Sequence, residues 1–265
     1  MREGPGQTEL TRRAAATANV LAIGSCRIFR PLRHLHKRGD INLLNHGQCQ
    51  WFTHSAGSAR QYVDVIQARA SIPAELREAA LETTIAFPDD MRWQPSHPPD
   101  LTIVEVSSLK EHRVGRTQLN AHKIYQIVRR MGLPHRPVLS GDTAALASDH
   151  ELKPLHVERT SERKLADDLL AIRRQLDTVL LTVNHLYSEK QNGEPVVGRV
   201  EITNELEKLE REHGVAFFDT KDIILEHGVD IALLDQNHYR PEFEPVVAAA
   251  LLARIRALGP FAKRQ

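Results

Sequence analysis

Ser25 lies where a short apolar segment gives way to a basic one, in the sequence Val-Leu-Ala-Ile-Gly-Ser-Cys-Arg at residues 20–27. This pattern predicts a buried strand that ends at Gly24 and a helix that starts directly afterwards. A hydroxyl at that turn would lie at a helix N-terminus, where the dipole and free backbone N–H groups stabilise developing negative charge. The placement suits a nucleophile that attacks a carbonyl group, although an ordinary tight turn gives the same pattern.

A candidate base lies near the other end of the chain, in Leu-Leu-Asp-Gln-Asn-His-Tyr-Arg-Pro at residues 233–241. Asp235 and His238 form the only Asp-x-x-His in the sequence. An imidazole held by a carboxylate through one ring nitrogen can accept a proton at the other. We therefore expect a catalytic triad of Ser25, His238 and Asp235, with Pro241 at the start of the last helix. His185, at the end of a predicted strand, is an alternative base.

The segments between these two ends alternate between strand and helix patterns. Short apolar or β-branched runs predict strands at Asn19–Ile23, Ile41–Asn45, Leu101–Ser107, Thr178–Val183 and Val215–Asp219. Helical periodicity is found at Arg27–Arg38, Ala59–Ala70, Pro73–Leu81, Gln118–Met131, Ser161–Leu176 and Ile202–His213. Because helices between buried strands imply parallel crossovers, we expect an α/β fold. The expected architecture is a three-layer α/β/α sandwich with a central, mostly parallel five-stranded sheet, as in flavodoxin-like folds.

The domain organisation follows from the same patterns. Residues 1–16 carry no apolar anchor and are expected to form a disordered tail. Residues 17–265 are expected to form a single domain with a helical insert at about 112–175. This insert is a candidate lid or acceptor-specificity element.

The Gly-Ser-Cys block and the Asp-x-x-His block together resemble the SGNH/GDSL hydrolase superfamily. Gly24, Ser25 and Cys26 look most like the GSCFA branch, with Arg27 and Ile28 where that branch has Phe-Ala. The resemblance implies an esterase or O-acyltransferase that forms an acyl-enzyme on Ser25 and passes the acyl group to water or to another hydroxyl. The implied substrate is a small-molecule or glycan ester. Hydrolysis would need no cofactor, whereas acyl-CoA is a candidate donor for transfer.

In that superfamily, donors to the oxyanion follow the second and third strands. The resembling position after the second strand is Gly47 or the turn at 55–57, and these alternatives stay open. After the third strand, Ser107 or Ser108 stands where most members have an asparagine. The backbone N–H of Ser25 is expected to complete the oxyanion hole.

Several other side chains are candidates for the site. Arg27 and Arg30 follow the nucleophile on a helix whose basic residues are expected to point outward, so they could attract an anionic substrate or the phosphates of an acyl donor. Asn184 is a candidate substrate contact after the fourth strand. Glu105, within a buried strand, is expected to pair with an arginine or lysine. Cys26 is an alternative nucleophile, because a thiol at a helix N-terminus tends to have a depressed pKa.

Composition excludes several classes of protein. With 265 residues and 41% hydrophobic content the chain can bury a full core, and its net charge of +1 gives no case for a nucleic-acid partner. Two cysteines make no disulfide framework and suggest a reducing compartment. The spacing of the histidines and cysteines indicates no metal site, and no apolar run is long enough for a membrane span. We expect a cytoplasmic enzyme, of undetermined oligomeric state, or else a non-catalytic binding module of the same fold.

Overall fold

The structure is a computed structural model that describes residues 17–83, 91–184, 194, 197–235 and 237–259. Its main sheet consists of parallel strands in the order β2-β1-β3-β7-β8. Their bounds are Ala18–Ile23 (β1), Ile41–Leu43 (β2), Leu101–Glu105 (β3), Val179–Asn184 (β7) and Ala216–Asp219 (β8). The predicted fold class, an α/β protein with a central five-stranded sheet, is confirmed.

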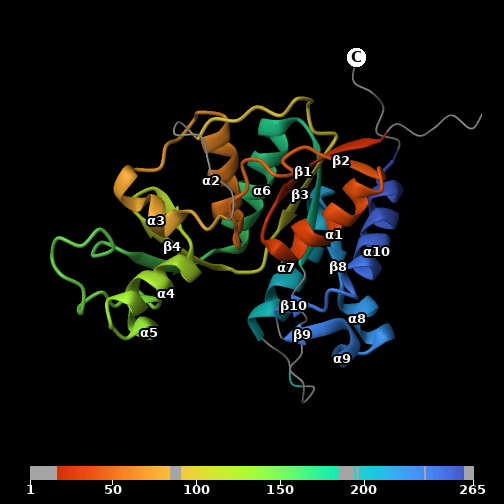
Figure 1. The fold of residues 1–265 in the computed structure, drawn as a ribbon. Helices are drawn as coiled ribbons and strands as arrows, with labels where there is room; N and C mark the ends of the chain where they lie inside the picture. The colour runs from red at the N-terminus through yellow and green to blue at the C-terminus, as the bar shows by residue number, and fades with distance from the viewer. Residues whose placement is uncertain (1–16, 84–90, 185–193, 195–196, 236, 260–265) are drawn as a thin grey trace, which may run out of the picture.

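Helices cover both faces of this sheet (Figure 1). One face is covered by α1 (Cys26–Lys37) and α10 (Glu244–Ala257), the other by α2 (Ala56–Ile66), α6 (Glu162–Leu176) and α7 (Val197–His213). The alternation of side chains along β1 supplies both cores: Val20 and Ala22 join the α1 side, whereas Leu21 and Ile23 join the α2 side.

The insert after β3 differs from its prediction as a helical segment. It contains a small antiparallel sheet in the order β5-β4-β6 as well as two helices. The elements are β4 (Lys110–Val114), β5 (Thr117–Leu119), α4 (Ala121–Arg130), α5 (His135–Val138) and β6 (His156–Arg159). β4 and β6 are short and rich in charged residues, and β5 has only three residues, so these strands lack the apolar alternation that marks a strand in sequence. The helix that follows, α6, packs against α2 and belongs to the sandwich.

Short elements complete the chain. The connection from β2 to β3 carries η1 (Ala74–Leu76) and α3 (Arg77–Ala80), and β8 is followed by α8 (Lys221–His227), α9 (Val229–Ala232), β9 (Leu233–Asp235) and β10 (His238–Tyr239). The last helix begins at Glu244 with Pro245 in its first turn, and not at Pro241 as predicted, because a separate turn occupies residues 241–243. In the described part of the chain, no helix has the length and apolar character needed to cross a bilayer.

The order of the strands makes the point between β1 and β3 a topological switch point. The chain runs from β1 outward to β2 and then returns to β3 on the other side of β1. In open parallel sheets, ligands bind at such a switch point, at the carboxyl ends of the strands. Ser25 follows β1 and Glu105 ends β3, so both residues lie at this switch point.

Candidate active site

Ser25 is the N-cap of α1, directly after β1. Its backbone is extended, with φ −107° and ψ −174°, and its Oγ accepts the backbone N–H of Arg27 at 3.3 Å. This contact satisfies one of the donors that the first turn of a helix leaves unbonded. The strand–turn–helix arrangement predicted around Ser25 is therefore present. The residue is only 3% exposed.

The hydroxyl of Ser25 is held by Glu105, for which the sequence analysis expected an arginine or lysine partner but no contact with Ser25. Ser25 Oγ donates to Glu105 Oε2 at 2.7 Å, and the backbone N–H of Ser25 donates to the same oxygen at 2.8 Å. Glu105 is completely buried. Because its own N–H is bound in this way, Ser25 does not offer the backbone oxyanion donor that the sequence led us to expect.

Gly24 makes this approach of β1 and β3 sterically feasible. A Cβ added at Gly24 would lie 2.6 Å from Glu105 Cβ, 3.0 Å from Glu105 Oε2 and 2.7 Å from Ile28 Cγ2. The first and last of these distances are too short for non-bonded carbon atoms. Glycine at this position is therefore required by the Glu105 side chain, in addition to any requirement of the turn.

Arg27 completes an ion pair with Glu105. The guanidinium Nη2 lies 2.8 Å from Glu105 Oε1, and Nε donates to Ser25 Oγ at 3.0 Å. This confirms that Glu105 pairs with a basic side chain, but it corrects the prediction that Arg27 points outward, since its side chain is only 10% exposed. Arg30, expected beside an anionic substrate, instead donates to Glu244 of α10 at 3.2 Å.

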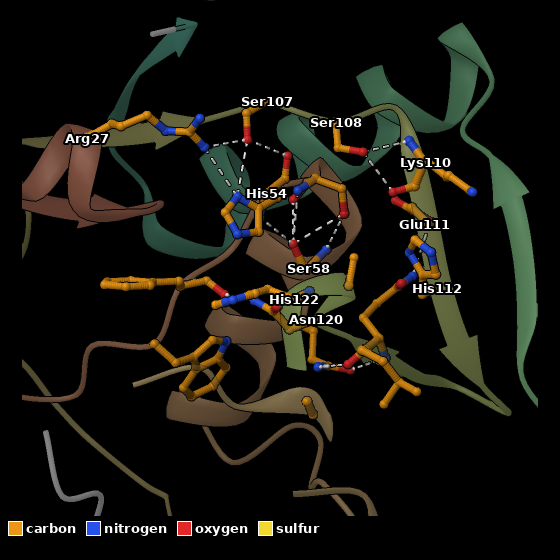
Figure 2. Close-up of a pocket in the computed structure, with 18 residues that line it drawn as sticks. Arg27, His54, Ser58, Ser107, Ser108, Lys110, Glu111, His112, Asn120 and His122 are labelled. Carbon is orange, nitrogen blue, oxygen red and sulfur yellow. Dashed lines mark hydrogen bonds between the residues drawn. The ribbon is translucent and has the colours of Figure 1, made fainter. Parts of the chain in front are cut away.

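Ser107 and His54 surround the far side of the Arg27 guanidinium (Figure 2). Arg27 Nη2 donates to Ser107 Oγ at 3.2 Å and lies 3.4 Å from His54 Nδ1. The distance between His54 Nδ1 and Ser107 Oγ is 3.2 Å. Burial lowers the pKa of His54, so its imidazole is neutral at pH 7. Ser107 was predicted as a site residue, whereas His54 was not.

The sequence carries no periodic signal for His54. The structure brings it to the site because the Thr53 N–H donates to the Gly24 carbonyl, which lays the segment before α2 along the end of β1. The N–H groups of Ser107 and Ser108 in turn donate to the His54 carbonyl. Backbone pairing of this kind leaves no mark in the pattern of side chains.

A cavity of about 270 Å³ opens beside these residues, between the main sheet and the insert. Figure 2 shows His54, Ser107 and Arg27 at one end, with Asn120 and His122 on the opposite wall. Most of the residues that line it are polar, although apolar atoms supply more of its surface. The polar residues are Arg27, His54, Ser55, Ser58, Gln61, Ser107, Ser108, Lys110, Glu111, His112, Gln118, Asn120 and His122. The cavity can therefore take a small molecule with polar groups beside Arg27, His54 and Ser107, whereas Ser25 is not among the residues that line it.

Asp235 and His238 do form a carboxylate–imidazole pair. They face each other across the β9–β10 hairpin, with His238 Nδ1 2.9 Å from Asp235 Oδ2 and 3.0 Å from Oδ1. Partial burial raises the pKa of Asp235, but hydrogen bonds from His238 and from the Asn237 N–H outweigh it and lower the pKa overall. The pair fixes the orientation of the imidazole, as a general base requires.

The hairpin lies at the same edge of the main sheet as Ser25. The Tyr239 hydroxyl donates to Thr220 Oγ1 at 3.0 Å, directly after β8. Arg199 of α7 donates to Asn237 Oδ1 at 2.7 Å. Burial lowers the pKa of Arg199, and the positive charge of Arg27 lowers it further. In the described residues, however, the Ser25 hydroxyl donates its hydrogen bond to Glu105 and not to His238. The predicted triad is thus assembled in part.

The candidate donors after β2 have other tasks. Gly47 sits in an exposed turn with φ +71° and does not line the cavity. In the alternative turn, Ser55 caps α2 together with Ser58, and the Gly57 N–H donates to Glu111 Oε1 at 3.2 Å. Neither prediction is supported by this geometry.

Two further candidates are also placed differently from their expected roles. Asn184 is buried and donates to Thr203 of α7 at 3.1 Å, so it holds the helix against β7. Burial raises the pKa of the Cys26 thiol, with Arg27 and Arg30 opposing this, so the expected depressed pKa is wrong. His185 lies outside the described residues. Within those residues, no three His, Cys, Asp or Glu side chains converge as a metal site.

Comparison with known proteins gives a family match over most of the chain. The model of the TviD N-terminal domain matches residues 18–137 and 133–254. Among solved structures, the esterase EstA of Pseudoalteromonas sp. is 10% identical, with a TM-score of 0.44 over 91% of this chain and 98% of that one. A putative arylesterase of Agrobacterium tumefaciens str. C58 is 14% identical, with a TM-score of 0.32 over 92% and 100%. Structural similarity at this level establishes no activity, and no curated protein matches the sequence.

Proposed function

Because the chain belongs to the TviD N-terminal domain family, we propose that it transfers acyl groups through a serine ester, as an esterase or an O-acyltransferase. The family's domain is related to acetyltransferases and takes part in O-acetylation of the Vi antigen, which supports an acylated small molecule or glycan as substrate. The observation that carries the proposal is the position of Ser25: its hydroxyl caps a helix at the switch point of the sheet and accepts from Arg27, whose side chain lines the cavity.

In the proposed reaction, Ser25 Oγ attacks the ester carbonyl while His238 accepts the hydroxyl proton. The C–O bond to the leaving alcohol then breaks, and His238 returns the proton to that alcohol. Water or an acceptor hydroxyl attacks the acyl-enzyme by the same steps in reverse. Asp235 orients His238 and stabilises the imidazolium that forms. The Ser25 hydroxyl must turn from Glu105 toward His238 for the first step.

The oxyanion donors follow from the geometry around Arg27. The single N–H of the Ser25 backbone is bound to Glu105. Arg27 Nη2 also pairs with Glu105, but it carries a second N–H, and this nitrogen lies next to Ser107 Oγ on the cavity wall. A guanidinium and a hydroxyl both donate to a developing oxyanion, and preorganised donors of this kind are worth on the order of 10²–10³ in kcat. We assign them this role in place of Gly47 and the Ser25 N–H.

The volume of the cavity limits how much of a substrate can bind in it. At about 270 Å³ it is slightly smaller than the roughly 300–1,000 Å³ of pockets that enclose drug-sized ligands. It therefore suits a single small unit, such as an acyl group with part of its alcohol. Hydrolysis needs no cofactor, and if acyl-CoA is the donor, only its thioester end would enter the cavity.

A fluorophosphonate probe tests the proposal. The wild-type protein should become labelled and should hydrolyse 4-nitrophenyl acetate, and Ser25→Ala should abolish both activities. Ser71→Ala, a change at an exposed serine, is the matched control and should retain both. A wild-type protein that neither reacts with the probe nor cleaves the ester would favour the non-catalytic binding module.

The same assay separates the two candidate nucleophiles. Because its pKa is raised, the Cys26 thiol should react slowly with iodoacetamide at pH 7, and Cys26→Ala should keep ester hydrolysis. Inactivation by iodoacetamide, together with activity in Ser25→Ala, would instead assign catalysis to Cys26.

A further inference from the structure

Glu105 is the point at which three donors of the candidate site meet. Its Oε2 accepts the Ser25 hydroxyl at 2.7 Å and the Ser25 N–H at 2.8 Å, and its Oε1 pairs with Arg27 Nη2 at 2.8 Å. The carboxylate has no exposed surface. A buried charge is costly unless it is paired and hydrogen-bonded, so its two oxygens hold their partners in fixed places.

A second buried carboxylate network shows what is particular to Glu105. Asp168 of α6, 7% exposed, pairs with Arg60 at 3.0 Å and with Lys164 at 2.8 Å. That network joins helices and contacts none of the candidate reacting groups. Glu105, in contrast, touches the proposed nucleophile with one oxygen and a cavity-lining guanidinium with the other.

We propose that Glu105 is a positioning residue that holds the nucleophile Ser25 and the oxyanion donor Arg27 at a fixed distance from each other. The inference rests on the proposed function, and it adds a residue that the superfamily resemblance does not supply. The Ser25 N–H remains bound to Glu105 when the hydroxyl turns toward His238, so the hydroxyl rotates without displacement of the backbone. Gly24 is part of the same device, since any side chain there would push Glu105 away from Ser25.

Glu105→Asp tests this role. The variant keeps the negative charge that Arg27 requires but withdraws the carboxylate by one methylene. Since a misplacement of about 1 Å can cost on the order of 10²-fold in rate, kcat for 4-nitrophenyl acetate should fall at least tenfold while KM stays within twofold. The matched control is Asp168→Glu, which also changes a buried, ion-paired carboxylate by one methylene. It should lower Tm without lowering kcat.

Gly24→Ala provides a second route that alters no polar group. The added methyl should displace Glu105 and reduce kcat in the same manner, whereas Gly198→Ala in α7, where a Cβ meets nothing within 4 Å, should keep the wild-type kcat. This pair of variants also decides the matter if Glu105→Asp does not fold. A crystal structure of either site variant should show Ser25 Oγ shifted relative to Arg27, a readout that needs no activity.

The possible failures are distinguishable. If Ser25→Ala abolishes probe labelling but both Glu105→Asp and Gly24→Ala keep wild-type kcat, Glu105 is a structural ion-pair partner only and the inference is overturned. If Ser25 is never labelled and its alanine variant retains ester hydrolysis, the proposed function fails and the inference fails with it.

Discussion

The Tyr239 hydroxyl donates to Thr220 Oγ1 at 3.0 Å, and this bond ties the hairpin of Asp235 and His238 to the end of β8. Tyr239 is buried, and burial raises the pKa of its phenol, so the hydroxyl stays protonated as a donor. The hydrogen bond therefore fixes the hairpin that carries the exposed Asp235–His238 pair against the end of β8.

Tyr239→Phe should therefore affect both stability and rate. Loss of the bond leaves the Thr220 hydroxyl without this partner and should cost about 1–2 kcal/mol of unfolding free energy. Because the hairpin then has more freedom, kcat should fall severalfold with little change in KM. Thermal unfolding and ester hydrolysis measure the two effects. Tyr125→Phe, on α4, is the control, and an equal loss of kcat there would argue against a role for the hairpin.

Ser25→Ala should destabilise the protein as well as inactivate it. Ser25 caps α1, and loss of such a cap costs about 0.5–2 kcal/mol. For a domain of this size, Tm falls by about 2–4 °C per kcal/mol. Differential scanning calorimetry of Ser25→Ala should show this drop, whereas Ser25→Thr, which keeps a capping oxygen, should lose less. An unchanged Tm in the alanine variant would mean that the cap contributes nothing.

The two arginines of α1 should respond very differently to replacement by glutamine. Arg27→Gln leaves the buried Glu105 carboxylate without its counter-charge and should cost about 3–5 kcal/mol. Arg30→Gln breaks a half-exposed pair with Glu244 and should cost at most about 1 kcal/mol. Urea denaturation measures both values, and equal losses would show that the Arg27 pair is no more important than a surface pair.

Stability should fall in mildly acidic solution because of His54. Burial lowers its pKa in the folded protein, with a further decrease from Arg27 and an opposing effect of Glu105. The unfolded chain takes up a proton near pH 6.5, so below that pH the unfolded state binds more protons than the folded state. The contribution of His54 to stability is thus complete above about pH 6.5 and is lost as the pH falls toward the lowered pKa.

Thermal unfolding at several pH values between about 7.5 and 5 checks this dependence. His54→Gln should reduce the slope of Tm against pH relative to the wild type. Burial also lowers the pKa of His112, so the variant His54→Gln/His112→Gln should reduce the slope further. Parallel curves for all three proteins would contradict the prediction.

The sequence alone determined the sheet and the position of Ser25, the proposed nucleophile, at the end of β1. Buried parallel strands consist of short continuous apolar runs, so the strands from β1 to β8 of the main sheet were predicted to within two residues at each end. The turn at Gly24 and Ser25 and the pairing of Asp235 with His238 are local, separated by few residues, and were therefore also legible in the sequence.

Only the tertiary structure decided what surrounds Ser25. Glu105 is 80 residues away from it in the chain, and it reaches the hydroxyl because β1 and β3 are neighbours in register, which no local pattern encodes. His54 reaches the site through backbone hydrogen bonds, which carry no side-chain signature. Periodicity predicted Arg27 on the outer face of α1, but its side chain points inward because it pairs with the buried Glu105 carboxylate. Local sequence patterns record which segments are buried, whereas the partners of a buried charge depend on contacts between distant segments.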